Sequence, residues 1–334
     1  MTELKNGEAT LWTPLVGFDR DLPGHGAEEY LEKVGFRPSA ISLFVFNADI
    51  INLHPGMDKE FPFPQDYCNY YGSLRNELRT IQPWTNYDLR ELAAELKKSG
   101  VDTYMGIMGN HTPDQTTWFG QSSTQKFLLQ HPELIMQGYG GTNNLYALKR
   151  FADGSYFEDY FVEMARKTLN DYGIGGVHMS DGFCPPNSTL NSGDFSDDMI
   201  GQFMDMTGIS LPNEVAAPLN DPASAGLEGR TQYIWYHYRA EWIRFIGRRW
   251  EQFFTKLCRT LHADGKKVMV NNSWTSEPFE AIYRYGIDYK GLERAGVDVI
   301  CVEDQATAVH SCDAPGAAYR IHEYMQTPMI TKAY

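Results

Sequence analysis

The chain has 334 residues, of which 42% are hydrophobic and 22% charged, so it can bury a large core and disorder is expected to be local at most. Its formal net charge of −14 leaves no basic stripe that could neutralise phosphates, which argues against a nucleic acid or an anionic membrane surface as the partner. We therefore expect a substrate that is neutral or that binds at a local patch.

Cysteine usage and the polar N-terminus indicate a reducing compartment. The five cysteines include no CxxC pair and are odd in number, so at least one thiol lacks an intrachain partner. Residues 2–10 contain no apolar signal region, and no run approaches the ~20 apolar residues of a membrane span. We expect a soluble cytoplasmic protein, unless a leader was replaced by this start.

Three hydrophobic strands are predicted in the first part of the chain, each ending in polar residues. They cover residues 11–18, 41–47 and 101–108, and the second is the apolar run ISLFVFN, which is typical of a strand buried on both faces. Helices are predicted at 28–34 and 85–98, the latter with Thr85 as its cap and Gly100 after its end. The segment 48–83 is expected to be a functional loop, because ordinary connections are shorter.

The same alternation continues along the rest of the chain. Helices are predicted at 116–130, 156–169 and 195–208, with a short hairpin at 145–151. A short apolar strand within 175–186 runs into Asp181, and further strands are predicted at 267–274, 297–304 and 328–334. Within 230–262, five large side chains share one helical stripe, which indicates core packing: Trp235, Tyr238, Trp242, Phe245 and Ile246.

The fold class follows from a unit that recurs three times. In SGVDTYMGIMGN, YGIGGVHMSDGF and AGVDVICVEDQA, a helix ends at a glycine and a strand follows that finishes in polar residues. Helices that alternate with buried strands specify a parallel sheet, so we predict an α/β fold, a (β/α)8 TIM-type barrel forming one domain over 1–334, with long loops after strands 2 and 4. Seven strands are recognised, so either one was missed near Leu145 or the sequence is the front of a longer protein whose last strand and further C-terminal domains lie outside it.

Polar residues at the strand ends form the predicted site, because the carboxyl ends of barrel strands converge on one face. A buried carboxylate is costly unless it is solvated, paired or functional. Aromatic faces pack on the C–H faces of sugar rings, and amides form hydrogen bonds with sugar hydroxyls. The predicted substrate-binding residues are Asp19, Arg20, Asn47, Asn110, His111, His178, Asn272, Trp274 and Lys332. Further candidates at or near the strand ends are Asp49, Asn271, Trp118, Tyr139 and Phe183.

Two carboxylates on facing strands are what glycoside hydrolysis requires, one to donate a proton to the leaving oxygen and one to attack carbon or activate water. Asp181 and Glu303 are the predicted catalytic pair. Alternation along the sixth strand turns Cys301 and Glu303 inward, but an ungapped match of strands four and six aligns Asp181 with Asp304, so Asp304 stays a candidate.

The strand-end series, the SDGF break and the segment FSDDMIGQFMDMTGISLP resemble the barrels of glycoside hydrolases, above all the broad β-galactosidase-like group. The resemblance implies a glycosidase without a cofactor, acting on an oligosaccharide or glycoside. Those enzymes carry Asn-Glu at the fourth strand, where this chain has Ser180-Asp181, so their acid/base residue does not transfer. An Asp there looks more like the nucleophile of barrel α-glycosidases, which would leave Glu303 or Asp304 as the acid/base and the anomeric preference open.

Two other readings stay open at this point. A metal-dependent barrel hydrolase would use His111, His178, Asp181 and His310, although the paired HxH of such enzymes is absent from the first strand. A non-catalytic carbohydrate-binding barrel would tolerate replacement of its acids. No phosphate loop or dinucleotide fingerprint is present, since GIGG at Gly173 precedes a strand, so we expect no cofactor; a homo-oligomer is left open.

Overall fold

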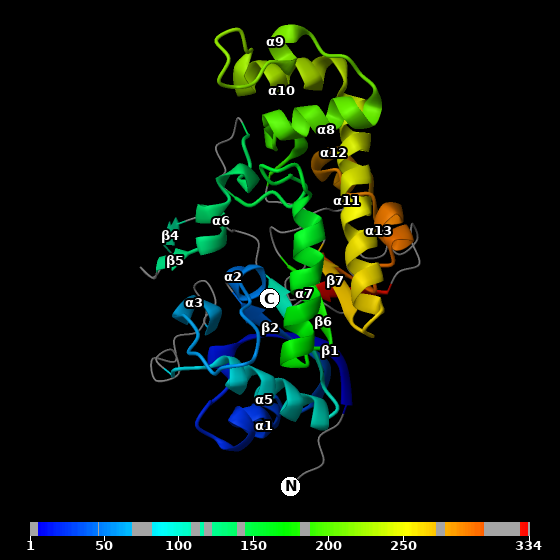
Figure 1. The fold of residues 1–334 in the computed structure, drawn as a ribbon. Coiled ribbons are helices and arrows are strands. Elements are labelled where there is room, and N and C mark those ends of the chain that lie inside the picture. Colours follow the sequence, from blue (N-terminus) through cyan, green and yellow to red (C-terminus); the bar gives the residue numbers. More distant parts are fainter. Residues whose placement is uncertain are drawn as a thin grey trace.

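The computed structural model describes residues 6–45, 47–68, 82–107, 114–116, 122–138, 144–180, 188–271, 278–303 and 328–332 (Figure 1). Seven strands form one parallel sheet whose spatial order follows the chain. They are β1 Asn6–Pro14, β2 Arg37–Val45, β3 Asp102–Ile107, β6 Gly176–Met179, β7 Lys267–Asn271, β8 Val299–Glu303 and β9 Met329–Lys332. A strand order that steps one way around a parallel sheet is that of a (β/α) barrel, so the predicted α/β class is confirmed, as a partial barrel whose edges within the described residues are β1 and β9.

Helices follow the strands as predicted for βα units. Those of the first half are α1 Ala27–Val34, α2 Asp49–Asn52, α3 Gln65–Cys68, α5 Asn86–Lys98, α6 Lys126–Gln130 and α7 Phe157–Tyr172. Those of the second half are α8 Asp197–Thr207, α9 Asn213–Ala216, α10 Gly226–His237, α11 Arg239–His262, α12 Pro278–Tyr285 and α13 Tyr289–Ala295. Short 3-10 turns lie at η1 Leu15–Gly17, η2 Pro23–Gly26, η3 Pro132–Leu134 and η4 Leu190–Ser192.

Local sequence signals account for several of these boundaries. The Thr85 side chain accepts from the backbone N–H of Asp88 while the Asp88 carboxylate accepts from that of Thr85, a complete capping box at the start of α5. Ser196 caps α8 by accepting from Met199, and the helix ends at Gly208 in the left-handed conformation. The predicted helices 28–34, 85–98, 156–169 and 195–208 are thereby confirmed, with shifts of a few residues.

Four predicted elements differ from the structure. The first strand begins at Asn6 and ends at Pro14, earlier than expected. The predicted helix 116–130 is wrong: the antiparallel pair β4 Asp114–Thr116 and β5 Ser122–Thr124 spans its beginning and the two residues before it, and within 116–130 the described residues are helical only in α6. The expected hairpin at 145–151 does not form, because Leu145 and Arg150 make isolated bridges to Ile135 and Tyr156 instead. The 230–262 segment divides into α10 and α11 at Tyr238.

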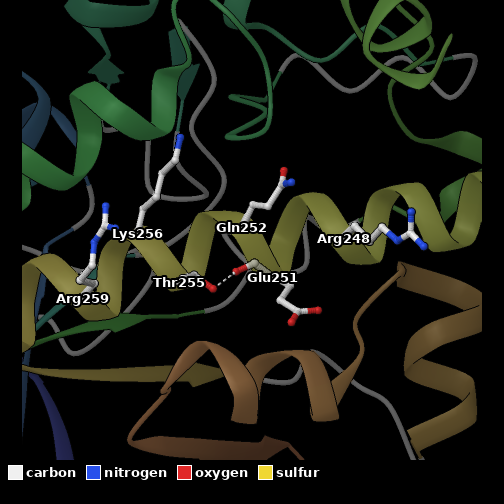
Figure 2. Close-up of a pocket in the computed structure, with 6 residues that line it drawn as sticks. All are labelled: Arg248, Glu251, Gln252, Thr255, Lys256 and Arg259. Atoms are coloured by element: carbon white, nitrogen blue, oxygen red, sulfur yellow. Dashed lines mark hydrogen bonds between the residues drawn. The ribbon is translucent and has the colours of Figure 1, made fainter. Parts of the chain in front are cut away.

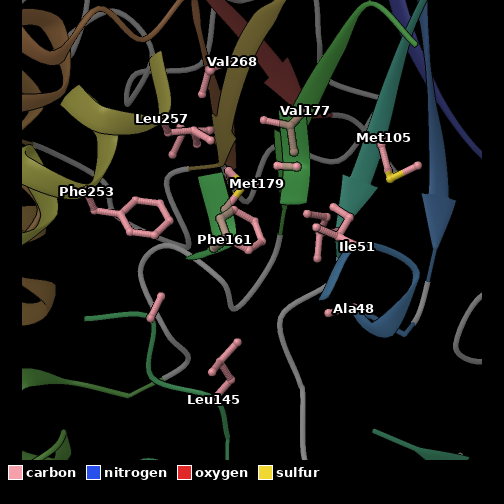
Figure 3. Packing of buried hydrophobic residues seen from close by; sticks show 14 of the residues in the cluster. Ala48, Ile51, Met105, Leu145, Phe161, Val177, Met179, Phe253, Leu257 and Val268 are labelled. Atoms are coloured by element: carbon pink, nitrogen blue, oxygen red, sulfur yellow. The ribbon is translucent and has the colours of Figure 1, made fainter. Parts of the chain in front are cut away.

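The main core lies between the outer face of the sheet and the helices. Phe161 of α7 and the pair Phe253 and Leu257 of α11 pack toward the strands β6 and β7, where Val177 and Val268 point outward (Figure 3). The stripe predicted on 230–262 belongs to this core, because Trp242, Phe245 and Ile246 are buried in it and Trp235 and Tyr238 pack against it.

The inner face of the sheet carries a second, smaller layer of side chains, which shows that the sheet is curled. Trp12 of β1 and His178 of β6 have ring centroids 4.8 Å apart, although β2 and β3 lie between their strands. In a flat sheet three strand spacings would separate these positions by about 14 Å. The inner cluster also contains Ala40, Tyr104 and Met269.

Gly176 permits close packing on this inner face. A methyl group at position 176 would lie 2.5 Å from the backbone oxygen of Lys267 and 2.8 Å from the ring of Tyr104. We expect Gly176→Ala to lower the free energy of unfolding by about 1–3 kcal/mol through overpacking, as measured by urea denaturation. Gly201→Ala in α8 is the control: its methyl group would meet Arg150 Nη2 at an ordinary 3.6 Å, and better helix propensity should make it neutral or stabilising. Equal losses in both variants would contradict the packing argument.

A buried ion pair joins the barrel helices to the segment that follows β6. Arg249 of α11 and Glu158 of α7 each have side chains 1% exposed and meet at 2.6 Å. All five N–H groups of Arg249 have acceptors: Glu158 takes two, and the others go to Gln202, Gln252 and the carbonyl of Leu148. Lys256 also binds Glu158, at 2.8 Å, so the buried carboxylate is fully compensated.

Removing the carboxylate of this buried pair should lower the free energy of unfolding much more than removing the exposed carboxylate next to it. We expect Glu158→Gln to cost about 3–5 kcal/mol of unfolding free energy, because Arg249 is left with an uncompensated buried charge. Asp159→Asn removes an adjacent carboxylate that also binds Lys256 but is 56% exposed, and should cost at most about 1 kcal/mol. Chemical denaturation of both variants measures the difference, and a loss below about 1 kcal/mol for Glu158→Gln would show that the pair is not a structural anchor.

Candidate active site at the carboxyl edge of the sheet

Polar positions follow one another along the carboxyl edge of the inner face. Asn271 of β7 is the register partner of Cys301 on β8, and Glu303 of β8 is the partner of Lys332 on β9. Register partners of a parallel sheet share a face, and Met269, two residues before Asn271, is the partner of His178. These positions therefore lie on the face that carries His178, while Ile300 belongs to the outer core, as the predicted alternation requires.

The fourth strand of the sheet, β6, leads directly to Asp181. The backbone N–H of Ser180 donates to the carbonyl of Ile107 at 3.0 Å, so sheet pairing continues to the residue before the predicted catalytic Asp181. Ser180 is buried. Asp181 itself lies outside the described residues. The structure therefore fixes only the position of Ser180, the residue before it.

His178 of β6 is built into the inner wall of the barrel by side chains from β1 and β2. Its Nδ1 lies 2.9 Å from Ser42 Oγ of β2, and its ring packs edge-on against Trp12 and Phe44. The bond crosses over β3, where a methyl group at Gly106 would stand 2.6 Å from Ser42 Oγ. A glycine at position 106 is therefore what lets β2 and β6 bond over the strand between them.

Asp19 and Arg20 are held by the segment that leads into α5. Arg20 Nε donates to Asp88 Oδ2 at 2.7 Å, and Gln82 donates to Asp19 at 2.8 Å. The hydrogen bond to Asp88 raises the pKa of Arg20 above its ordinary value. Asp88 is also the capping-box residue of α5, so Arg20 ties the β1 loop to the start of that helix.

Asn47 and Asp49 organise the turn after β2. Asn47 donates to Asp66 at 2.7 Å and accepts from the backbone N–H of Asp49. The Asp49 carboxylate accepts from the backbone N–H groups of Lys126 and Phe127 at the start of α6. Burial raises the pKa of Asp49, because desolvation outweighs the stabilisation of the charged form by those two donors.

The remaining predicted site residues divide into two groups. Glu303 and Lys332 are placed by the backbone register of β8 and β9. The others lie outside the described residues: Asp181, Asp304, Asn110, His111, Asn272 and Trp274, together with the aromatic candidates Trp118, Tyr139 and Phe183. The structure thus brings together the strand ends of β6 to β9, whereas it directs Asp19, Arg20 and Asn47 toward structural partners.

Sequence reasoning missed three residues of the inner wall, Trp12, Ser42 and Phe44. Trp12 and Phe44 have ring centroids 5.0 Å apart and enclose His178. The available signal was alternation: Ser42 and Phe44 occupy every second position of the run ISLFVFN, between the outward Ile41, Leu43 and Val45. A strand buried on both faces hides this signal, since both sets of positions are apolar.

A surface pocket of about 470 Å³ lies elsewhere, along α11 (Figure 2). Its lining residues all come from that one helix: Arg248, Glu251, Gln252, Thr255, Lys256 and Arg259. Lys256 is bound to Glu158 and Asp159, and Glu251 is bound twice by Arg294 of α13. Because Lys256 and Glu251 already form ion pairs, we regard this pocket as a feature of the helix surface and not as a second candidate active site.

In the part of the chain that the structure describes, no group of three or more His, Cys, Asp or Glu side chains is arranged to hold a metal ion. In the same residues, no helix combines the length and the hydropathy needed to cross a membrane.

Comparison with known proteins gives remote structural likenesses. No family model matches the sequence, and no curated protein matches it. Similar solved structures include a class V chitinase from Pseudomonas fluorescens, at 13% identity over 90% of this chain and 55% of that one, with a TM-score of 0.38. The PgaB glycoside hydrolase domain from Bordetella bronchiseptica is 14% identical over 94% of this chain and 79% of its own, with a TM-score of 0.43.

An old yellow enzyme homologue from Zymomonas mobilis is equally similar, at 13% identity over 97% of this chain and 78% of that chain, with a TM-score of 0.39. This chain spans about half the length of the Pseudomonas chitinase chain. Because hydrolases and a flavoenzyme homologue occur together at such scores, the likenesses do not distinguish functions. The fold assignment rests on the sheet itself.

The bond between Ser42 and His178 should contribute measurably to stability. We expect Ser42→Ala to cost about 1–3 kcal/mol, because a buried ring nitrogen loses this partner. Ser39→Ala is the matched control on the same strand, where an exposed hydroxyl bonds the carbonyl of Ala9, and it should change stability by about 0.5 kcal/mol or less. Urea denaturation compares the two, and indistinguishable effects would contradict the assigned bond.

Proposed function

We propose that this protein is a glycoside hydrolase that cleaves a glycosidic bond with a pair of carboxylates, Asp181 and Glu303. The observation that carries the proposal is the register of the carboxyl edge. Positions 271, 301, 303 and 332 are linked through β7, β8 and β9 and share the inner face with His178, and Asp181 follows Ser180, the last paired residue of the fourth strand. Acids on different strands of one barrel edge suit attack and protonation from opposite sides of a sugar.

The register also supports a division of roles between the two acids. The backbone register pairs position 332 with position 303, and we propose that the lysine at 332 favours the ionised form of Glu303. An ionised Glu303 suits the nucleophile, or the base that activates water, whereas Asp181 would protonate the departing oxygen. In the net reaction water adds across the glycosidic bond, giving a sugar hemiacetal and an alcohol. Asp304 remains the alternative second acid, because position 304 adjoins the strand end.

Paired variants test both the activity and the roles. Aryl glycosides of both anomeric configurations are screened against the unmodified protein, Asp181→Asn, Glu303→Gln and the neighbouring control Asp304→Asn. We expect Asp181→Asn to lower kcat/KM about 10²–10⁴-fold with a poor leaving group and much less with dinitrophenol, which departs without a proton. Glu303→Gln should lose activity with both leaving groups, whereas Asp304→Asn should retain it.

Further measurements separate the alternatives. If Glu303 is a nucleophile, added azide should restore turnover of Glu303→Ala, in which the truncated side chain leaves room for azide, and yield a glycosyl azide. NMR of the product anomer formed by the unmodified protein distinguishes retention from inversion. Loss of activity in Asp304→Asn with full activity in Glu303→Gln would transfer the role to Asp304. Unchanged rates in both Asp181→Asn and Glu303→Gln would remove the proposed pair altogether.

A further inference from the structure

Exposed aromatic side chains gather where α10, α11 and α12 meet. Tyr236 at the end of α10 is 83% exposed and Tyr283 of α12 is 50% exposed. Trp235, which is partly buried, links them to the core: its ring centroid lies 6.1 Å from that of Tyr283. Aromatic rings this exposed lose the benefit of burial, so their concentration at one place indicates a binding surface.

Polar groups border these rings. The Arg239 guanidinium lies 5.0 Å from the centroid of the Trp235 ring, and its Nε donates to the Trp235 carbonyl, which holds both side chains in place. Tyr236, Arg239, Glu241 and Tyr283 are among the residues that line a surface pocket of about 440 Å³. We name this set, with Trp235, the aromatic surface.

The aromatic surface lies beyond the carboxyl edge of the sheet. Helix α11 has 24 residues and a length of about 36 Å, whereas β7, which follows its C-terminus, has five residues and spans about 17 Å. The N-terminal part of α11 therefore projects past the strand ends, and α12, in the connection that leaves β7, packs beside it (Figure 1). The surface and the proposed active site are thus on the same side of the barrel.

We propose that the aromatic surface is a second carbohydrate-binding site, which holds a neutral polysaccharide chain away from the carboxylate pair. The C–H faces of pyranose rings pack on the electron-rich faces of Tyr and Trp, and Arg239 and Glu241 can bond the hydroxyl groups at the ring edges. The net charge of −14 disfavours a polyanionic glycan over a neutral one.

The size of the surface favours a sugar chain over a protein partner. The pocket on this surface is lined by eight residues. Its volume of about 440 Å³ falls within the range of about 300–1,000 Å³ that is usual for small-molecule sites. A second copy of the chain is therefore the weaker candidate, and the test includes it as an outcome.

Binding is measured separately from hydrolysis, so that failure of either proposal can be recognised. Native gels containing glucomannan, arabinoxylan, xyloglucan, galactomannan or dextran are run with the unmodified protein, Tyr236→Ala, Tyr283→Ala and the control Leu129→Ala, whose side chain is 55% exposed on α6. We expect at least one polysaccharide to retard the protein and each tyrosine variant to bind it about three- to tenfold more weakly. The control should bind unchanged, and aryl glycoside hydrolysis should be the same in all four proteins.

Three results would overturn this proposal. The first is that no polysaccharide retards the unmodified protein. The second is retardation that survives in the Tyr236→Ala, Tyr283→Ala double variant, which would place binding elsewhere. The third is a dimer in sedimentation velocity that dissociates in Tyr236→Ala, which would make the surface an interface between copies. Loss of aryl glycoside hydrolysis in the Asp181 and Glu303 variants concerns only the proposed active site.

Discussion

The buried pair Glu158–Arg249 is the constraint on which the arrangement of this molecule depends. It connects α7 and α11, the two helices that cover β6 and β7, and it reaches α8 through Gln202. An arginine can be buried only where all its N–H groups find acceptors, and here those acceptors come from three helices and a backbone carbonyl. The geometry of one side chain thereby fixes how the segment following β6 is attached to the barrel.

A second set of contacts, farther from the sheet, holds together the segment between β6 and α11, which we call the excursion. Arg230 of α10 is fully buried and donates to the carbonyls of Phe195 and Val215 as well as to Asp197. Arg150 binds Asp198 through both its backbone and its side chain. Since each contact joins parts of the chain that are distant in sequence, guanidinium groups, of which that of Arg230 is fully buried, help to organise the excursion alongside its apolar core.

Curvature, in turn, determines what the strands can bring together. Ser42, His178 and Trp12 meet only because the sheet curls and because glycines at positions 106 and 176 leave room on its inner face. The carboxyl ends of β6 to β9 share that concave face, which is why acids separated by more than a hundred residues can be considered for one reaction. The proposed chemistry depends on this curvature rather than on any local motif.

The sequence was informative about elements whose determinants are local. Seven strands were recognised because each is an apolar run, three of which follow a glycine and end in polar residues, and α5 because Thr85 and Asp88 form its cap. The segment 116–130 was misjudged, since its periodic residues compete with a Thr- and Ser-rich stretch that pairs as strands.

The site was predictable only in part, for a physical reason. Alternation along a strand tells which face Glu303 and His178 occupy, but not which groups meet them across the barrel. Arg20 and Asp49 illustrate the limit: both follow strands and carry charge, yet their partners are Asp88 and the first N–H groups of α6, which no spacing in the sequence reveals. A charged residue at a strand end can bind a neighbouring helix or loop just as well as it can bind a substrate.

Helix α11 has a consequence for how a long substrate would be handled. It contains no proline, and it belongs to the barrel at its C-terminal end and to the excursion at its N-terminal end. The chain changes direction at Tyr238, which lies before the first residue of α11. A continuous helix of this kind keeps the carboxyl edge and the aromatic surface at a fixed distance from each other, because it contains no hinge. A polysaccharide bound at the aromatic surface would be present at the carboxyl edge at a high effective concentration. Only polysaccharides longer than the distance between the two sites would gain affinity in this way.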